Sequence, residues 1–261
     1  MNNILLLEDL TCSGECSSLI SLPVLFNLNL NPIFVPTMIL STHTGGNNMP
    51  YKFDMVDKSC EIIKNLSVNN KEINGVFMGY LSPNIDENFI NTISNLNAKI
   101  YLDPVMADNS KFYKGFDESY INKILPLIKR SEVITPNLTE ACFLLNKEYK
   151  DFSINEVEDM LYELAKFNSK YVVITGVKKD NLIGVMAIDC SSNLIYFYFH
   201  EYVNASYFGT GDLFKSVLFS KMFLGNSLLD SIKSACDIIV DCIKESNNPP
   251  HLNYINRIKK V

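Results

Sequence analysis

The residues best suited to chemistry lie in the C-terminal fifth of the chain, where a glycine-rich turn opens an apolar helical pattern. The run is Tyr207-Phe208-Gly209-Thr210-Gly211-Asp212-Leu213-Phe214. Gly209 and Gly211 lack a Cβ, so the backbone can present N–H groups to an anion at a helix start. Asp212 would repel a phosphate, which suggests a general base acting on an attacking hydroxyl. A plain turn with an acidic residue that complements the helix dipole fits equally well, so both interpretations stay open here.

Two oxygen-rich segments follow short apolar runs elsewhere in the chain. They are Asp103-Pro104-Val105 and Thr135-Pro136-Asn137-Leu138-Thr139-Glu140. Taken singly, the first suits a turn, and the second suits a helix start capped by Asn137 or Thr139 with Glu140 in the first turn. Taken together, they place two carboxylates and an amide at neighbouring strand ends, an arrangement suited to Mg²⁺ and phosphate.

A histidine follows the second apolar run, in Thr42-His43-Thr44-Gly45-Gly46. A single histidine is often structural, but hydroxyls and glycines on both sides in a predicted loop also suit a ligand contact. Cys12 and Cys16 flank the loop after the first strand, where small half-buried residues are the simpler interpretation.

The elements that must position these residues are short apolar runs that alternate with amphipathic stretches. This alternation predicts an α/β fold with a mostly parallel sheet covered on both faces. The predicted strands are Ile4–Leu7, Ile33–Val35, Val76–Met78, Ile100–Leu102, Val133–Ile134 and Tyr171–Thr175, with a hairpin of Leu182–Ile188 and Leu194–His200. The predicted helices are Ser17–Leu30, Asp54–Ser67, Asn84–Leu96, Glu118–Lys129, Asn155–Phe167, Thr210–Leu224 and Ser227–Ser246. Ligands gather at the carboxyl ends of parallel strands, so we expect Asp9, Tyr80 and Thr175 to join the residues above.

Composition narrows the function classes. The 261 residues show no linker or repeat and predict one domain over residues 1–261. A net charge of −6 without a basic stripe argues against nucleic acid as a partner. The N-terminus lacks a basic leader and prolines interrupt the uncharged stretch after Cys16, so we expect a cytoplasmic protein with no membrane association. A P-loop is absent, and seven cysteines without paired spacing beyond Cys12 and Cys16, together with three histidines, argue against structural zinc.

The ordered motifs resemble the pyridoxal kinase branch of the ribokinase-like superfamily over nearly the whole chain. The segments that carry the resemblance are Thr42–Gly45, Gly79-Tyr80, Asp103–Val105, Thr135–Glu140, Val173–Gly176 and Gly209–Phe214. Ser41-Thr42-His43-Thr44-Gly45-Gly46 and Asp9-Leu10-Thr11-Cys12 are most similar to the bacterial pyridoxal/pyridoxamine kinase group.

The resemblance implies a three-layer α/β/α fold, ATP with Mg²⁺ as donor, and the 5′-hydroxymethyl group of vitamin B6 as acceptor in pyridoxal 5′-phosphate salvage. Asp212 would be the catalytic base, and Gly209, Thr210 and Gly211 would form the anion hole. Asp103 and Glu140 would bind the metal. ATP would be contacted by Asn137, Thr175 and Thr210. The vitamin pocket would be lined by Asp9, His43, Thr44 and Tyr80. Residues 106–115 would form a flap over ATP. The resemblance also suggests a homodimer, and whether a monovalent cation assists is left open.

One segment departs from the family pattern. Ser13-Gly14-Glu15 stands where an aromatic residue, glycine and arginine are expected, which changes the charge beside the vitamin pocket.

A hydroxymethylpyrimidine kinase is the nearest alternative function, but such enzymes tend to carry cysteine at the position matching Asp212. A sugar kinase lacks support because its glycine-rich sugar loop is not evident. A non-catalytic B6- or ATP-binding protein would have no use for a base beside the phosphate turn.

Overall fold

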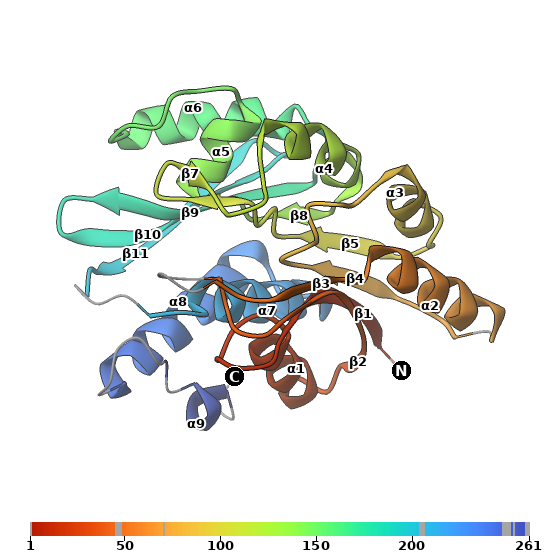
Figure 1. Cartoon of the computed structure of the whole chain (residues 1–261). Helices are drawn as coiled ribbons and strands as arrows, with labels where there is room; N and C mark the ends of the chain where they lie inside the picture. Colours follow the sequence, from red (N-terminus) through yellow and green to blue (C-terminus); the bar gives the residue numbers. More distant parts are fainter. Residues whose placement is uncertain are drawn as a thin grey trace. The chain divides into compact units, whose positions relative to one another are not determined.

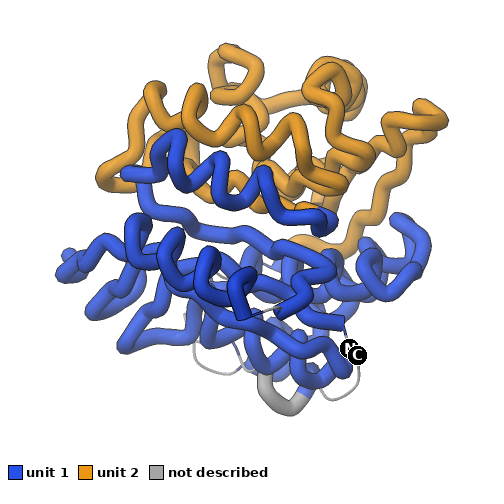
Figure 2. Tube along the Cα trace, turned by 90° about the vertical axis from the view of Figure 1, so that its right-hand side faces the viewer, with its two compact units in different colours: residues 1–99, 203–261 blue, residues 100–202 orange. Residues whose placement is uncertain are grey.

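A computed structural model describes residues 2–44, 49–69, 71–203, 207–246, 252 and 254–258 (Figure 1). The chain forms two compact units, coloured separately in Figure 2. Unit 1 holds residues 1–99 and 203–261, and unit 2 holds residues 100–202. The single domain expected over residues 1–261 stays a prediction. Gly45 and Gly46 of the histidine segment lie outside the described residues.

The strands of unit 1 run in the order β4-β1-β2-β3. They are β1 (Asn3–Thr11), β2 (Asn31–Leu40), β3 (Lys52–Asp54) and β4 (Gly75–Met78). Strand β1 pairs in parallel with β2 and β4, and β3 joins β2 antiparallel. The continuous apolar run of β1 is almost fully buried from Ile4 to Leu7, as expected for a parallel strand covered on both faces.

Helices cover both faces of these strands. They are α1 (Ser18–Asn27), α2 (Val56–Val68), α3 (Glu87–Ser94), α7 (Thr210–Phe223), α8 (Leu228–Glu245) and the short α9 (Ile255–Ile258). In Figure 1, α1, α7 and α8 lie on one side of the unit 1 strands and α2 and α3 on the other. Helix α7 is buried along its middle, residues 213–220, where it packs against α1 and α8.

The strands of unit 2 run in the order β5-β8-β9-β10-β11. They are β5 (Lys99–Leu102), β8 (Val133–Ile134), β9 (Tyr171–Lys179), β10 (Leu182–Asp189) and β11 (Leu194–Glu201). The first three pair in parallel, and β9, β10 and β11 form an antiparallel meander. Its helices are α4 (Glu118–Arg130), α5 (Leu138–Leu144) and α6 (Ile154–Ala165), and a small hairpin pairs β6 (Ala107–Asp108) with β7 (Lys111–Phe112).

The predicted α/β fold with a mostly parallel sheet is confirmed, including the hairpin β10–β11. Strands β1, β2 and β9 run well past their expected ends, and β2, predicted over Ile33–Val35, spans Asn31–Leu40. Asp9 lies inside β1 because β1 continues to pair with β2 as far as Leu40, past a bulge between Glu8 and Asp9. Thr175 lies inside β9, which continues to Lys179 because β10 pairs with it. Within the described residues, no helix combines the length and apolar character that a membrane crossing requires.

Candidate active site

The glycine-rich turn at the start of α7 has a backbone conformation that favours glycine. Gly209 precedes the helix in the left-handed region, at φ 80°. A Cβ on Gly209 would lie 2.2 Å from Ile20 Cδ1 and 2.8 Å from the carbonyl oxygen of Glu15, so only glycine fits without rearrangement. The first N–H groups of a helix have no partner within it. Residues 209–211 therefore form a tight turn that opens onto a helix N-terminus, and the anion hole assigned to them stays a prediction.

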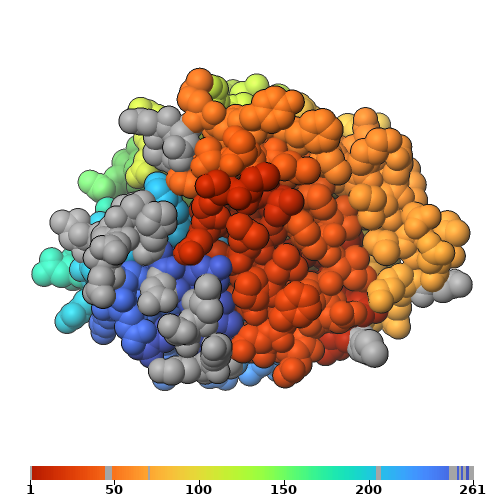
Figure 3. All heavy atoms as spheres, turned by 60° about the horizontal axis from the view of Figure 1, so that its bottom comes forward, coloured from red at the N-terminus to blue at the C-terminus, as the bar shows by residue number. Residues whose placement is uncertain are grey.

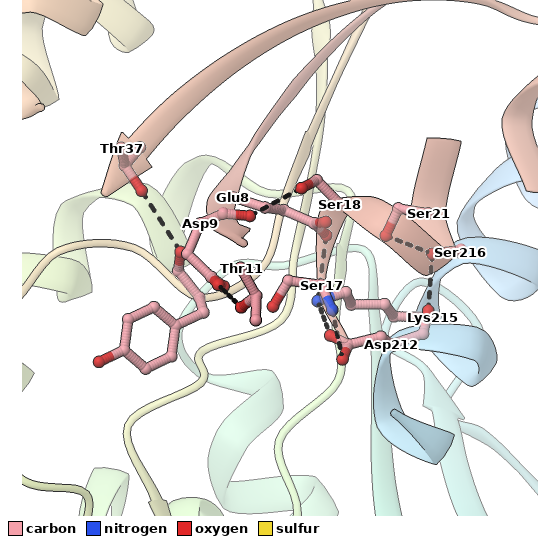
Figure 4. Close-up of polar contacts among 11 residues, drawn as sticks. Glu8, Asp9, Thr11, Ser17, Ser18, Ser21, Thr37, Asp212, Lys215 and Ser216 are labelled. Atoms are coloured by element: carbon pink, nitrogen blue, oxygen red, sulfur yellow. Dashed lines mark hydrogen bonds and ion pairs between the residues drawn. The ribbon is translucent and has the colours of Figure 1, made fainter. Parts of the chain in front are cut away.

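Asp212 lies in the first turn of α7 with both carboxylate oxygens held. Its Oδ2 accepts a hydrogen bond from the backbone N–H of Ser17 at 2.8 Å, and its Oδ1 accepts one from Lys215 Nζ at 2.7 Å (Figure 4). The side chain remains 18% exposed. A carboxylate oxygen has two lone pairs, so these contacts fix the group and still leave acceptor capacity for a substrate hydroxyl.

A buried ion pair between Lys215 and Glu8 lies next to Asp212, and the sequence did not predict it. Lys215 Nζ also lies 3.1 Å from Glu8 Oε1, and both side chains are 2% exposed (Figure 4). Burial raises the pKa of Glu8 to about 7, although the charge of Lys215 opposes the rise. The available signal was a lysine within the apolar run Leu213–Ser220, three residues after an aspartate. Such spacing places the two side chains on one helix face.

Asp9 lies beside this cluster in β1 and is almost fully buried. Its Oδ2 accepts a hydrogen bond from Thr11 Oγ1 at 2.7 Å, and its backbone oxygen accepts one from Ser18 Oγ (Figure 4). Burial raises the pKa of the Asp9 carboxyl. Its Oδ1 is buried without a hydrogen-bond partner among the described residues. Because a buried acceptor without a partner is costly, Asp9 is well suited to receive a donor from a ligand.

The aromatic residues predicted for the vitamin pocket lie in the same unit. The His43 ring packs on Phe208 with centroids 4.4 Å apart, and a Cβ on Gly14 would come within 2.8 Å of the His43 ring. Tyr80 follows β4 and is buried, and both burial and the charge of Asp9 raise its pKa. Thr44 is half-buried. Cys12, in the loop after β1, is exposed. The N-terminal segment that contains this loop is coloured red in Figure 3, where it reaches the surface.

Of the residues predicted for ATP and metal, Thr210 is the first residue of α7 in unit 1, and the others lie in unit 2. There Asn137 and Glu140 form a capping box at the start of α5. Asn137 Oδ1 accepts from the Glu140 N–H, and Glu140 Oε2 accepts from the Asn137 N–H, both at 2.9 Å. The same side chains hold the β6–β7 hairpin, since Glu140 Oε1 accepts from Met106 N–H at 2.9 Å and Asn137 Nδ2 donates to Ala107 O at 2.8 Å. Thr175 forms a bridge with Asn137 across the parallel strands. The helix-cap interpretation is thus confirmed, and tethering of the hairpin is a role that the sequence did not reveal.

Two carboxylates in unit 2 repel each other. The pKa of Glu140 is well above its usual range, mainly through burial and also through the charge of Asp103. A divalent cation near Asp103 would relieve this repulsion, and Mg²⁺ commonly takes only one or two carboxylates together with phosphates and water. In the described part of the chain, no three His, Cys, Asp or Glu side chains gather as a metal site. The Asp103 and Glu140 carboxylates would suit a metal that arrives with a triphosphate, and this assignment stays a prediction.

A model of the phosphomethylpyrimidine kinase family matches residues 31–255. The chain belongs to the phosphomethylpyrimidine kinase family. Among its curated relatives is the bifunctional thiamine biosynthesis protein ThiDN of Methanocaldococcus jannaschii, 24% identical over 238 residues. That match covers 88% of this chain, which spans only about half, 52%, of the relative.

Solved structures of related proteins have the same fold. A candidate phosphomethylpyrimidine kinase of Bacteroides thetaiotaomicron, crystallised with pyridoxal, has a TM-score of 0.86 and 29% identity, covering 98% of this chain and 91% of that one. The pyridoxal kinase of Lactobacillus plantarum has a TM-score of 0.91 at 23% identity, covering 100% and 96%. The predicted ribokinase-like fold and the resemblance to the pyridoxal kinase branch are confirmed.

Proposed function

We propose that this family member transfers a phosphoryl group from ATP to the 5′-hydroxymethyl group of pyridoxal, pyridoxamine or pyridoxine. One observation carries the proposal: Asp212 stands beside the glycine turn at the start of α7, with its carboxylate held at both oxygens and still partly exposed. A site that only bound phosphate would gain nothing from a carboxylate beside the glycine turn, because the carboxylate and the phosphate are both negatively charged and repel each other. A base that accepts a hydroxyl proton needs this placement.

Each residue has a distinct part in the proposed reaction. Asp212 accepts the proton of the substrate hydroxyl as the hydroxyl oxygen attacks the γ-phosphorus of ATP, the bond to the β,γ-bridging oxygen breaks, and ADP leaves. The N–H groups of residues 209–212 donate to the phosphoryl oxygens as charge spreads over them. The unpartnered Asp9 Oδ1 accepts a donor of the vitamin, while Tyr80 and His43 offer flat surfaces to its ring.

Unit 2 serves ATP and its metal in this proposal. Asp103 and Glu140 would hold Mg²⁺, which would neutralise phosphate charge when bound. Asn137 and Glu140 hold the β6–β7 hairpin by their hydrogen bonds, so the flap predicted at residues 106–115 would have a fixed base. A flap that covers the phosphates excludes water during transfer. Thr175 in unit 2 and Thr210 in unit 1 are the remaining expected ATP contacts.

The alternative substrate is hydroxymethylpyrimidine, because a relative from Aquifex aeolicus, 28% identical over 179 residues, is a hydroxymethylpyrimidine/phosphomethylpyrimidine kinase. Aspartate at position 212 and the crystallised complex of the Bacteroides relative with pyridoxal favour vitamin B6. A homodimer and a cytoplasmic location remain further predictions of this proposal.

A coupled assay of ATP turnover tests the function directly. We expect turnover with pyridoxal or pyridoxamine, little with hydroxymethylpyrimidine and none with ribose. Asp212→Ala should lower kcat by about 10²–10⁴-fold, the range attributed to a positioned base, while ATP still binds. A preference for hydroxymethylpyrimidine would replace the substrate assignment, and near-normal turnover by Asp212→Ala would remove the base.

A further inference from the structure

A lysine side chain is enclosed between two carboxylates at the base of the candidate site. Lys215 Nζ lies 2.7 Å from Asp212 Oδ1 and 3.1 Å from Glu8 Oε1 (Figure 4). Lysine is almost never fully buried unless it is paired, because removal of its charge from water is costly. Asp212 and Lys215 come from α7, and Glu8 comes from β1, so the pairs join two elements of unit 1.

The surrounding backbone leaves room for this ammonium group. Gly79 follows β4, and a Cβ added there would lie 2.1 Å from Lys215 Nζ and 2.7 Å from Glu8 Oε1. Any larger residue would therefore displace the pair. Ser216, the next residue of α7, donates to Ser21 Oγ of α1 at 2.8 Å, which ties α7 to α1 beside the pair (Figure 4). The position of Lys215 on α7 is thus determined by its contact with Glu8 of β1, by the space beside Gly79 after β4, and by the packing of α7 on α1.

This position has a consequence for Asp212. The carboxylate is gripped by the ammonium group on Oδ1 and by the Ser17 N–H on Oδ2, so rotation about its terminal bond would break two hydrogen bonds. Charge-assisted hydrogen bonds of this kind are about twice as strong as neutral ones. Proton transfer requires close alignment, and a misplacement of about 1 Å can lower the rate on the order of 100-fold.

We propose that Lys215, itself anchored by Glu8, is a positioning residue that aligns the Asp212 carboxylate for proton transfer. The inference rests on the proposed function, since it gives Lys215 this role only if Asp212 is the base. The competing explanation is purely structural: Lys215 would serve only to compensate the buried charge of Glu8. Glu8, Asp9 and Asp212 all lie near the ammonium group, so its loss would also leave carboxylates to repel one another.

The decisive comparison uses one single and one double variant. Lys215→Met keeps the length of the side chain but leaves the Glu8 carboxylate buried without its cation, so it should lower both stability and kcat. Glu8→Gln/Lys215→Met removes both charges of the buried pair and should recover much of the stability. Alignment of Asp212 would still be lost, so we expect kcat of the double variant to stay about 100-fold below that of the unaltered enzyme. The KM values for ATP and pyridoxal should change by less than about threefold.

An exposed pair on α2 supplies the control. Lys58 and Glu61 form the same type of i,i+3 pair at 2.9 Å, but their side chains are 63% and 65% exposed. Lys58→Met should leave kcat and stability nearly unchanged.

The outcomes separate this inference from the proposed function when Asp212→Ala is assayed beside these variants. If Asp212→Ala loses turnover while the stable double variant recovers kcat, the positioning role of Lys215 is refuted and the base assignment of Asp212 stands. Near-normal turnover in Asp212→Ala would refute the base assignment and the positioning role together. Low kcat in a double variant that is as stable as the unaltered enzyme, with unchanged KM values, would support the inference.

Discussion

Replacement of Glu8 by glutamine should change how the stability of the protein depends on pH. The Glu8 carboxyl titrates at about 7 in the folded chain against 4.5 for an ordinary glutamate, mainly because it is buried. Between these values the folded state keeps a proton that the unfolded state has released, so the contribution of Glu8 to stability falls as pH rises from 4.5 to about 7. Each pKa unit is worth about 1.4 kcal/mol, so the full loss is about 3.5 kcal/mol.

Glutamine has the shape of the protonated acid and does not titrate. The Glu8→Gln variant should therefore lack this loss, and its stability relative to the unaltered protein should rise by about 2–3 kcal/mol between pH 5 and pH 8. Other buried acids, Asp9 and Glu140 among them, titrate in both proteins, so their effects largely cancel in the difference. A constant offset from the altered hydrogen bond to Lys215 cancels as well.

Denaturant unfolding of both proteins at pH 5 and pH 8, with the slopes compared, measures this difference. Equal stability differences at the two pH values, within about 0.5 kcal/mol, would show that Glu8 is ionised in the folded state at both. The buried pair would then be a permanent ion pair, and the reasoning from desolvation would be wrong.

Two further substitutions probe the two ligand sites separately. Tyr80→Ala or His43→Ala should raise the KM for pyridoxal more than the KM for ATP, because both rings lie with Asp9 in unit 1; steady-state kinetics that show equal effects would count against their place in the vitamin pocket. Glu140→Gln should loosen the β6–β7 hairpin, because an amide can offer only one acceptor oxygen to the N–H groups of Asn137 and Met106. We expect a higher KM for ATP and faster amide exchange at Met106 and Ala107, and unchanged exchange there would refute the tether.

Much of the fold could be predicted because the hydrophobic pattern is local. Buried parallel strands read as continuous apolar runs, and those of β1, β5 and β8 were placed within a few residues. Strand ends were harder to predict. Asp9 and Thr175 follow apolar runs in the sequence, but pairing with β2 and β10 carries both strands past them. Such pairing depends on partners far away in the chain, so no local pattern reports it.

The candidate site divides in the same way. The sequence by itself determined the α/β class, the glycine turn with Asp212, and the cap at Asn137 and Glu140, because spacing along one helix fixes which side chains meet. Only the tertiary structure decided that Glu8 of β1 meets Lys215 of α7 at the space left by Gly79, and that the cap also holds the β6–β7 hairpin. These contacts join segments up to 207 positions apart in the case of Glu8 and Lys215, and packing of whole elements determines them. A buried charge is stable only where such packing brings its partner, and that place cannot be read from a single segment.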